Sequence, residues 1–176
     1  MDYSILIKQY RHTPDDLWLL VNTHQQQISL FKARNCLQSW PVSTATQGTG
    51  QLKGSLQTPL GAHRVAEKIG ADSLSGTLFV GRNNTGQCAD ILTQPVSSKK
   101  DQITSRILWL TGLEPGFNQG GDVDTLQRYI YIHGTPEEGL IGQPASHGCI
   151  RMKNRDIIEL FDLIKPETLV YIAESA

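Results

Sequence analysis

The chain has 176 residues and a formal net charge of −1 at neutral pH. This length fits a single domain, residues 1–176, that can bury a sizeable core. The balanced charge gives no sign of a nucleic-acid or anionic membrane partner. Three cysteines without regular spacing argue against a disulfide framework.

The start of the chain has no basic segment followed by an apolar stretch, as a secretory signal would. No apolar run is long enough to span a bilayer. We therefore expect a reduced, cytoplasmic protein. A chain that begins at a processed N-terminus would have the same features, so a periplasmic location is the alternative.

The first part of the chain is predicted to be β structure, because apolar runs and period-two alternation recur in it. We expect strands at 17–21, 27–33, 37–43 and 63–68. Glycine, threonine, serine and glutamine dominate residues 48–61, which predicts a long loop. Residues 70–102 are polar and give only weak signals.

In the second part, strands are expected at 105–110, 128–133 and 169–172. Residues 112–122 contain four glycines and one proline, which predicts a mobile connection that could serve as a flap. Apolar residues at helical spacing predict a helix over 155–164 with Asn154 as its N-cap. The fold class is therefore mainly β, with one or two helices packed on a sheet.

Two short stretches carry the chemistry of the chain, His133-Gly134-Thr135 and Ser146-His147-Gly148-Cys149-Ile150-Arg151. Cys149 lies between a predicted strand and a predicted helix, where a nucleophile can be exposed on a rigid backbone. A thiol paired with an imidazole can form a thiolate nucleophile. We expect Cys149 to have a lowered pKa and to alkylate faster than Cys36 or Cys88, which we interpret as structural. The alternative is a buried cysteine that acts as a small hydrophobe.

His133 is the candidate general base because it ends a predicted strand. Tyr131 lies on the same face of that strand and is a candidate contact for the substrate. The carbonyl of Gly134 could hold its second ring nitrogen in place of the acid of a triad. No acidic residue is marked out for that role. The N–H groups of Gly148 and Cys149 could stabilise a developing oxyanion.

The remaining candidates have two interpretations each. His147 either shapes the loop or contacts substrate, and the Ser146 and Thr135 hydroxyls either donate within the site or satisfy loop backbone. Arg151 either binds a substrate carboxylate or forms an ion pair that holds the loop. His133, His147 and Cys149 could also be metal ligands, although no standard ligand pair is present and no metal or other cofactor is expected.

These residues resemble the YkuD, or L,D-transpeptidase catalytic, family, whose signature is a histidine, a spacer and then Ser-His-Gly-Cys. The stretches 58–65 and 129–135 are also similar to the family, and the likeness covers about residues 15–173. The resemblance implies a β-sandwich-like catalytic domain with Cys149 at one end of a cleft. It implies that His133 is general base and acid, that Gly134 orients it, and that Gly148 and Cys149 line the oxyanion hole.

The resemblance also implies the substrate, a peptidoglycan tetrapeptide stem whose third residue is usually meso-diaminopimelate. Cys149 would attack the carbonyl of that residue, release D-Ala and form a thioester. A cytoplasmic enzyme would meet soluble muropeptides returning for recycling, so we expect water as the acceptor and L,D-carboxypeptidase activity. The alternative is an L,D-transpeptidase that forms 3→3 cross-links or exchanges D-amino acids. A muropeptide sensor without turnover is a third hypothesis.

Overall fold

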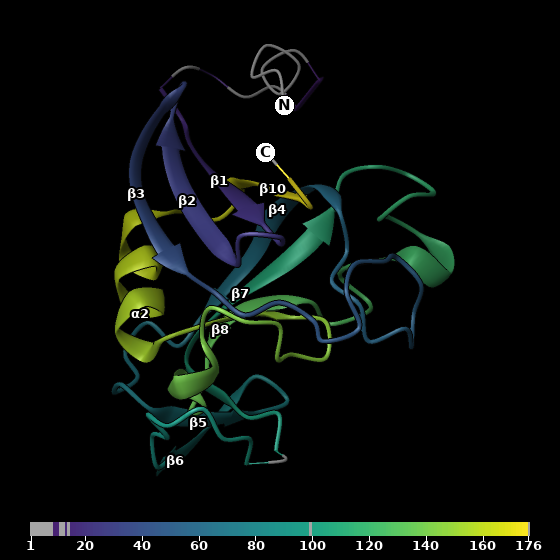
Figure 1. Ribbon diagram of the computed structural model, residues 1–176. Coiled ribbons are helices and arrows are strands. Elements are labelled where there is room, and N and C mark those ends of the chain that lie inside the picture. Colours follow the sequence, from purple (N-terminus) through teal and green to yellow (C-terminus); the bar gives the residue numbers. More distant parts are fainter. Residues whose placement is uncertain (1–8, 11–12, 14, 99, 176) are drawn as a thin grey trace.

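The computed structural model describes residues 9–10, 13, 15–98 and 100–175 (Figure 1). The expectations about residues 1–8 lie outside this part of the chain. One sheet of ten strands runs through the molecule in the order β3-β2-β1-β10-β4-β7-β5-β6, with β8 joined to β7 and β9 joined to β8. The strands are β1 (Leu17–Asn22), β2 (Gln27–Lys32), β3 (Asn35–Pro41), β4 (Gly61–Ile69), β5 (Thr77–Val80), β6 (Asn83–Cys88), β7 (Ile103–Gly112), β8 (Tyr131–Gly134), β9 (Ile150–Met152) and β10 (Leu169–Ala173).

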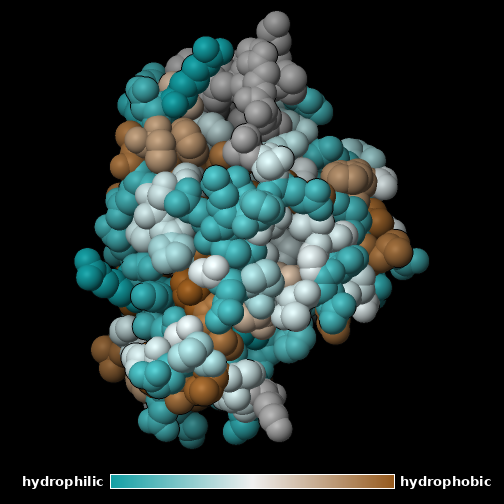
Figure 2. Space-filling model, in the orientation of Figure 1, coloured by the Kyte–Doolittle hydropathy of each residue, from teal (hydrophilic) through white to brown (hydrophobic). Residues whose placement is uncertain are grey.

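The last strand, β10, lies beside the first strand, β1, in the sheet. It pairs in parallel with β1 and antiparallel with β4, so it lies between the N-terminal hairpin and the centre of the sheet. Side chains alternate across each strand, and most of the buried apolar ones belong to one main core. The face of the molecule in Figure 2 is mainly hydrophilic, with scattered hydrophobic side chains. The fully buried members of the main core include Leu19, Ile28, Leu108, Leu110, Ile132, Ile150, Met152, Ile157 and Leu160.

The predicted helix is present as α2 (Asn154–Leu163), which packs on β7 and β8 through Ile157, Leu160 and Phe161. The prediction that Asn154 is its N-cap is wrong, because Lys153 is the N-cap and makes no side-chain bond. The carboxamide of Asn154 instead accepts bonds from the Thr104 and Ser105 hydroxyls and donates to the carbonyl of Thr135. Asn154 therefore joins the helix to β7 and to the end of β8.

Two parts of the fold differ from the sequence predictions. The hairpin β5–β6 lies in the polar segment that gave weak signals, and Figure 1 shows it beyond β8, at the opposite end of the molecule from β1 and β2. The strand expected from residue 128 begins only at Tyr131, since Tyr129 has a φ of 56° in the left-handed region.

The glycine-rich connection after β7 contains the short 3₁₀ helix η1 (Gly121–Val123). It is held to β4 by Asn118, whose side-chain amide donates to the carbonyls of Leu60 and Ala62 at 3.0 Å. Asn118 is fully buried. These side-chain bonds anchor the connection, so they do not favour the mobile flap that we expected here.

The register of β7, β8 and β9 decides which residues meet. β8 pairs with β9 in parallel, with Ile132 opposite Ile150 and His133 opposite Arg151. The isoleucines point into the main core. Because side chains alternate, Tyr131, His133 and Arg151 lie on the other face, where Cys149 packs against the cluster of Phe79, Ile107 and Tyr131.

Candidate active site

The sulfur of Cys149 lies against the backbone at the start of β8. The Tyr131 N–H donates to Sγ at 3.3 Å, and the thiol donates to the Tyr129 carbonyl at 3.4 Å. The residue is half-buried. Cys36 and Cys88 are exposed and free, so neither packs in the core as a structural cysteine would.

The ring of His133 is buried and its orientation is fixed from one side. Its Nδ1 lies 2.7 Å from the carbonyl oxygen of Gly134, so the backbone takes the place that a triad gives to an acid. Gly134 itself sits in a tight space, since a Cβ there would lie 2.6 Å from the Thr104 carbonyl oxygen. With Nδ1 as the donor, Nε2 is the nitrogen left to accept a proton.

Burial sets the protonation states of both groups. It lowers the pKa of His133 to about 4, against opposing effects of the Asp101 charge and the Gly134 carbonyl. It raises the pKa of Cys149 to about 12, although the Tyr131 N–H and the nearby arginines act in the other direction. The expected lowered pKa of the thiol is therefore wrong for the free protein. At neutral pH the pair is a neutral thiol and a neutral imidazole.

The loop that carries the cysteine is shaped by two buried hydroxyls. Ser146 Oγ donates to the Cys149 carbonyl at 2.5 Å and accepts the Gly148 N–H at 3.2 Å. Thr58 donates to the Gly148 carbonyl and accepts the Ala45 N–H, both at 3.0 Å. Gly148 has a φ of 131°, a backbone conformation that favours glycine.

The Ser146 bond concerns one of the two expected oxyanion donors, because the Gly148 N–H donates to Ser146 Oγ in the free protein. The expected role of this N–H in an oxyanion hole stays a prediction. The role of the Cys149 N–H stays a prediction. The Thr135 hydroxyl accepts the Glu137 N–H, so Ser146 and Thr135 both satisfy loop backbone, which was one of the two interpretations.

Arg151 is buried and both ends of its guanidinium bind carboxylates. Nη1 lies 2.8 Å from Glu137 Oε2, and Nη2 lies 2.7 Å from Asp101 Oδ1. Glu137 also accepts bonds from Ser97 and Ser98. These contacts support the ion pair that holds the loop rather than a site for a substrate carboxylate.

Asp101 is a site residue that the sequence did not mark out. Its second oxygen lies 2.8 Å from Nδ1 of His147, whose side chain is exposed. Burial alone would raise the pKa of Asp101, but His133, Arg151 and His147 together lower it. The only sequence signal was its place beside a pair of lysines in a polar segment, which is typical of a solvated loop.

Tyr131 is buried beside the catalytic candidates. Its ring meets that of His133 edge-on at a centroid distance of 6.5 Å, and its hydroxyl accepts a bond from Arg82 of the β5–β6 turn. Trp109 packs edge-on against Tyr131 and stacks with Tyr129. Tyr131 therefore supports the His133 ring, and its expected contact with substrate stays a prediction.

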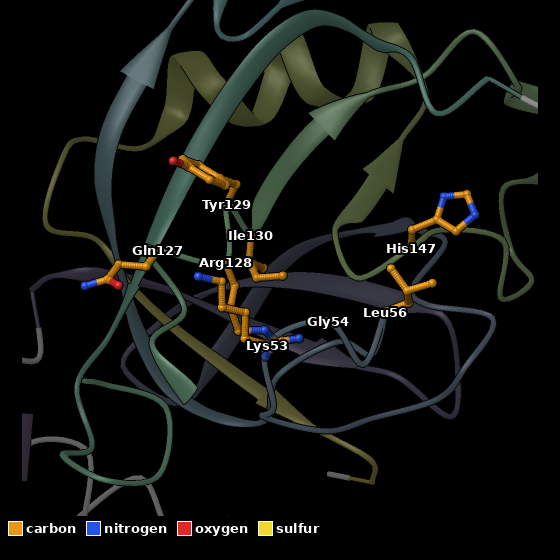
Figure 3. A pocket seen from close by; sticks show the side chains of 8 residues that line it. All are labelled: Lys53, Gly54, Leu56, Gln127, Arg128, Tyr129, Ile130 and His147. Atoms are coloured by element: carbon orange, nitrogen blue, oxygen red, sulfur yellow. The ribbon is translucent and has the colours of Figure 1, made fainter. Parts of the chain in front are cut away.

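Two pockets meet at His147. One, of about 340 Å³, is lined by Lys53, Gly54, Leu56, Gln127, Arg128, Tyr129, Ile130 and His147. In Figure 3 the side chains of Lys53 and Arg128 lie near the middle of the view, and those of Leu56 and His147 lie to the right. The second, of about 480 Å³, is lined by residues that include Asp101, Glu137 and Arg151. Within the described residues, no group of three or more His, Cys, Asp or Glu side chains could hold a metal ion.

Cys149 and His133 are the two kinds of group that acyl transfer requires. In such chemistry a neutral imidazole takes the proton of a neutral thiol when a carbonyl carbon approaches the sulfur.

The comparisons with known proteins agree with this fold and these motifs. The model of the L,D-transpeptidase catalytic domain family, YkuD, matches residues 16–172. The chain therefore belongs to the L,D-transpeptidase (YkuD) family. Its fold is mainly β, as predicted, and its solved structural neighbours are L,D-transpeptidases.

Among curated relatives, the putative L,D-transpeptidase YkuD of Bacillus licheniformis is 49% identical over 46 residues, which are 26% of this chain and 28% of that protein. The putative L,D-transpeptidase YqjB of Bacillus subtilis is 41% identical over 59 residues, 34% of this chain and 32% of that protein. The matched segments thus span about a third or less of these relatives.

Among solved structures, an L,D-transpeptidase from Enterococcus faecium gives a TM-score of 0.54 at 15% identity, covering 90% of this chain and 50% of that one. An L,D-transpeptidase from Mycobacterium smegmatis gives a TM-score of 0.52 at 15% identity, covering 90% and 58%. At these identities the likeness concerns the fold. Among the described residues, no helix is long and apolar enough to cross a bilayer.

Proposed function

We propose that this protein cleaves the bond between meso-diaminopimelate and the terminal D-Ala of a peptidoglycan tetrapeptide stem, through a thioester on Cys149. The observation that carries the proposal is the placement of the Cys149 sulfur at the start of β8, whose end holds a neutral His133 fixed by Gly134. Family membership supports a peptidoglycan substrate.

The proposed reaction has two acyl transfers. Cys149 Sγ attacks the carbonyl of the third stem residue while His133 Nε2 takes the thiol proton. The C–N bond then breaks, and the imidazolium returns that proton to the departing amine of D-Ala. In the second transfer water attacks the thioester, His133 takes a water proton, and the thiolate leaves and is reprotonated.

Water is the acceptor we propose, for an enzyme that meets soluble muropeptides in the cytoplasm. Transfer to an amine is the second candidate, because the pocket of about 480 Å³ on the far side of His147 offers room for an acceptor. Fractionation of the native protein tests the location. The acceptor is tested separately, by the products.

The test is incubation with disaccharide-tetrapeptide, followed by separation of the products with and without an added D-amino acid. We expect tripeptide and free D-Ala from the native protein and neither from Cys149→Ala. Dimers or D-amino acid exchange would favour the transpeptidase. Binding without any turnover, unchanged in Cys149→Ala, would favour a sensor and contradict the proposal.

A covalent probe checks the nucleophile without a peptide. One solved relative, the LD transpeptidase LdtMt1, is described in complex with imipenem. We propose that imipenem acylates Cys149 here, which mass spectrometry of the intact protein would detect. Cys36→Ala and Cys88→Ala are matched controls that keep the adduct, whereas Cys149→Ala loses it.

A further inference from the structure

The pocket beside the nucleophile has an excess of positive charge. Lys53 and Arg128 line it, and none of its lining residues is acidic. Within the described part of the chain, neither side chain makes a salt bridge. The pocket lies along Cys149, because Tyr129 and Ile130 line its wall and the Tyr129 carbonyl accepts the thiol.

Among the described residues, the groups that hold Arg128 in this place are neutral. Its guanidinium donates to the carbonyls of Gly50, Gln51 and Gln57, at 3.1, 2.8 and 2.6 Å. Carbonyl oxygens carry no formal charge, so the guanidinium keeps its full positive charge. Because Arg128 is half-buried, this charge acts more strongly than it would in bulk water. The three bonds hold loop 48–58 against Arg128, which itself lines the pocket.

Lys53 provides a second, adaptable cation on the same loop. Its backbone N–H donates to the Asp122 carbonyl at 2.7 Å, so its Cα is fixed while its side chain is exposed. No described residue binds its ammonium group. A compact charge on a flexible stem in the wall of such a pocket suits an anionic ligand group.

We propose that this pocket binds a carboxylate of the stem peptide, with Lys53 as the ion-pairing residue and Arg128 as a fixed charge behind it. This inference rests on the proposed function and defines its specificity. A tetrapeptide stem offers two such groups near the scissile bond, the terminal carboxylate of D-Ala and the side-chain carboxylate of diaminopimelate. The terminal carboxylate fits a cleavage that removes a single C-terminal residue.

Binding rather than turnover tests the proposal, so that it does not depend on catalysis. Calorimetry in the Cys149→Ala background compares three ligands, namely the tetrapeptide stem, its C-terminal carboxamide, and a stem with lysine in place of diaminopimelate. Lys53→Gln is combined with each ligand, and Lys165→Gln, a surface lysine that lies outside this pocket, is the matched control. Arg128 is left intact because it holds the loop.

For the unmodified stem we expect Lys53→Gln to raise Kd about fivefold, the range of an exposed ion pair, and Lys165→Gln to leave it unchanged. Replacing the terminal carboxylate by a carboxamide should raise Kd by a similar factor when Lys53 is present. In Lys53→Gln the stem and its carboxamide should have the same Kd. If the lysine stem abolishes the Lys53 effect instead, the diaminopimelate carboxylate is the bound group. The proposal is wrong if Lys53→Gln leaves the Kd of the unmodified stem unchanged. It is also wrong if the carboxamide and the lysine stem each lose the same affinity in the protein with Lys53 as in Lys53→Gln.

The two proposals fail in different ways. If the native protein shows no turnover while the Lys53 coupling persists, the proposed reaction fails and the carboxylate pocket stands. If turnover occurs without the coupling, the reaction stands and the pocket assignment is wrong. Lys53→Arg, which keeps the charge, should restore most of the lost affinity.

Discussion

The hydroxyl of Thr58 donates to the carbonyl of Gly148 at 3.0 Å, although the two residues are 90 positions apart. This bond connects the long loop after β3 to the residue that precedes the nucleophile. Thr58 is completely buried, and it also accepts the N–H of Ala45. The position of Cys149 therefore depends on a loop that contributes none of the reacting groups.

Replacing Thr58 with valine should loosen the nucleophile loop. The change leaves a buried carbonyl and a buried N–H without a partner, at a cost of about 1–3 kcal/mol in unfolding free energy. Because the sulfur would be held less tightly, we expect roughly a 10- to 100-fold loss in kcat. Thr168→Val, which alters another buried threonine far from the site, should affect stability alone. Equal kcat values for the two variants would refute this role.

The thiol of Cys149 should alkylate slowly in the free protein. Burial raises its pKa to about 12, so little thiolate exists at neutral pH, and the residue is only half-exposed. We expect iodoacetamide to modify exposed Cys36 and Cys88 first at pH 7, and the Cys149 rate to keep rising up to the alkaline limit of stability. Peptide mass spectrometry measures all three rates at once. Faster labelling of Cys149 at pH 7 would contradict a neutral resting pair.

The two carboxylates on Arg151 should have different roles. Glu137 is buried with the guanidinium, so Glu137→Gln should lower the unfolding free energy by about 3–5 kcal/mol. Asp101 is more exposed and its charge favours the protonated form of His133. Asp101→Asn should therefore lower kcat by about tenfold, since the imidazolium formed during catalysis loses a nearby charge.

Kinetics and chemical denaturation of both variants test this division. Asp101→Glu should recover part of the lost kcat, which a purely structural role would not explain. A larger kcat loss in Glu137→Gln than in Asp101→Asn would reverse the assignment.

Stability should fall as the pH is lowered from about 6.5 to 4. Burial lowers the pKa of both His133 and His63 from 6.5 to about 4. The unfolded chain thus binds more protons than the folded one in this window. Each histidine contributes about 3 kcal/mol that is fully present above pH 6.5 and is lost progressively as the pH falls to about 4. Urea denaturation at pH 7 and pH 5 measures the difference, and His63→Gln should reduce it. A stability that is flat over this range would show that these rings are protonated in the native state.

Much of the fold followed from local patterns in the sequence. Alternation predicted β1 and β2, and helical spacing predicted α2 to within a residue or two. The hairpin β5–β6 was missed because every residue of β6 is exposed and none shows an apolar period. Asn154 was misplaced because its partners, Thr104 and Ser105, are about 50 residues away.

The sequence predicted those contacts of the candidate site that are made by residues adjacent in the chain. His133 and the Gly134 carbonyl are neighbours in the chain, so their contact could be expected. Asp101 and Arg128 could not be found, since their roles depend on tertiary contacts across 50 or more positions. The protonation of Cys149 was also beyond the sequence, because burial decides it.

The parallel pairing of β8 with β9 determines where the chain between them can accept inserted residues. The two strands are aligned by their own hydrogen bonds, and the chain that joins them turns at the exposed residues Gly142, Gln143 and Pro144. Extra residues inserted there would lengthen an outer bend without moving either strand. Gln143 and Pro144 also line the pocket of about 480 Å³, so a tether or recognition module grafted at this bend would reshape that pocket while Cys149 and His133 stay in place.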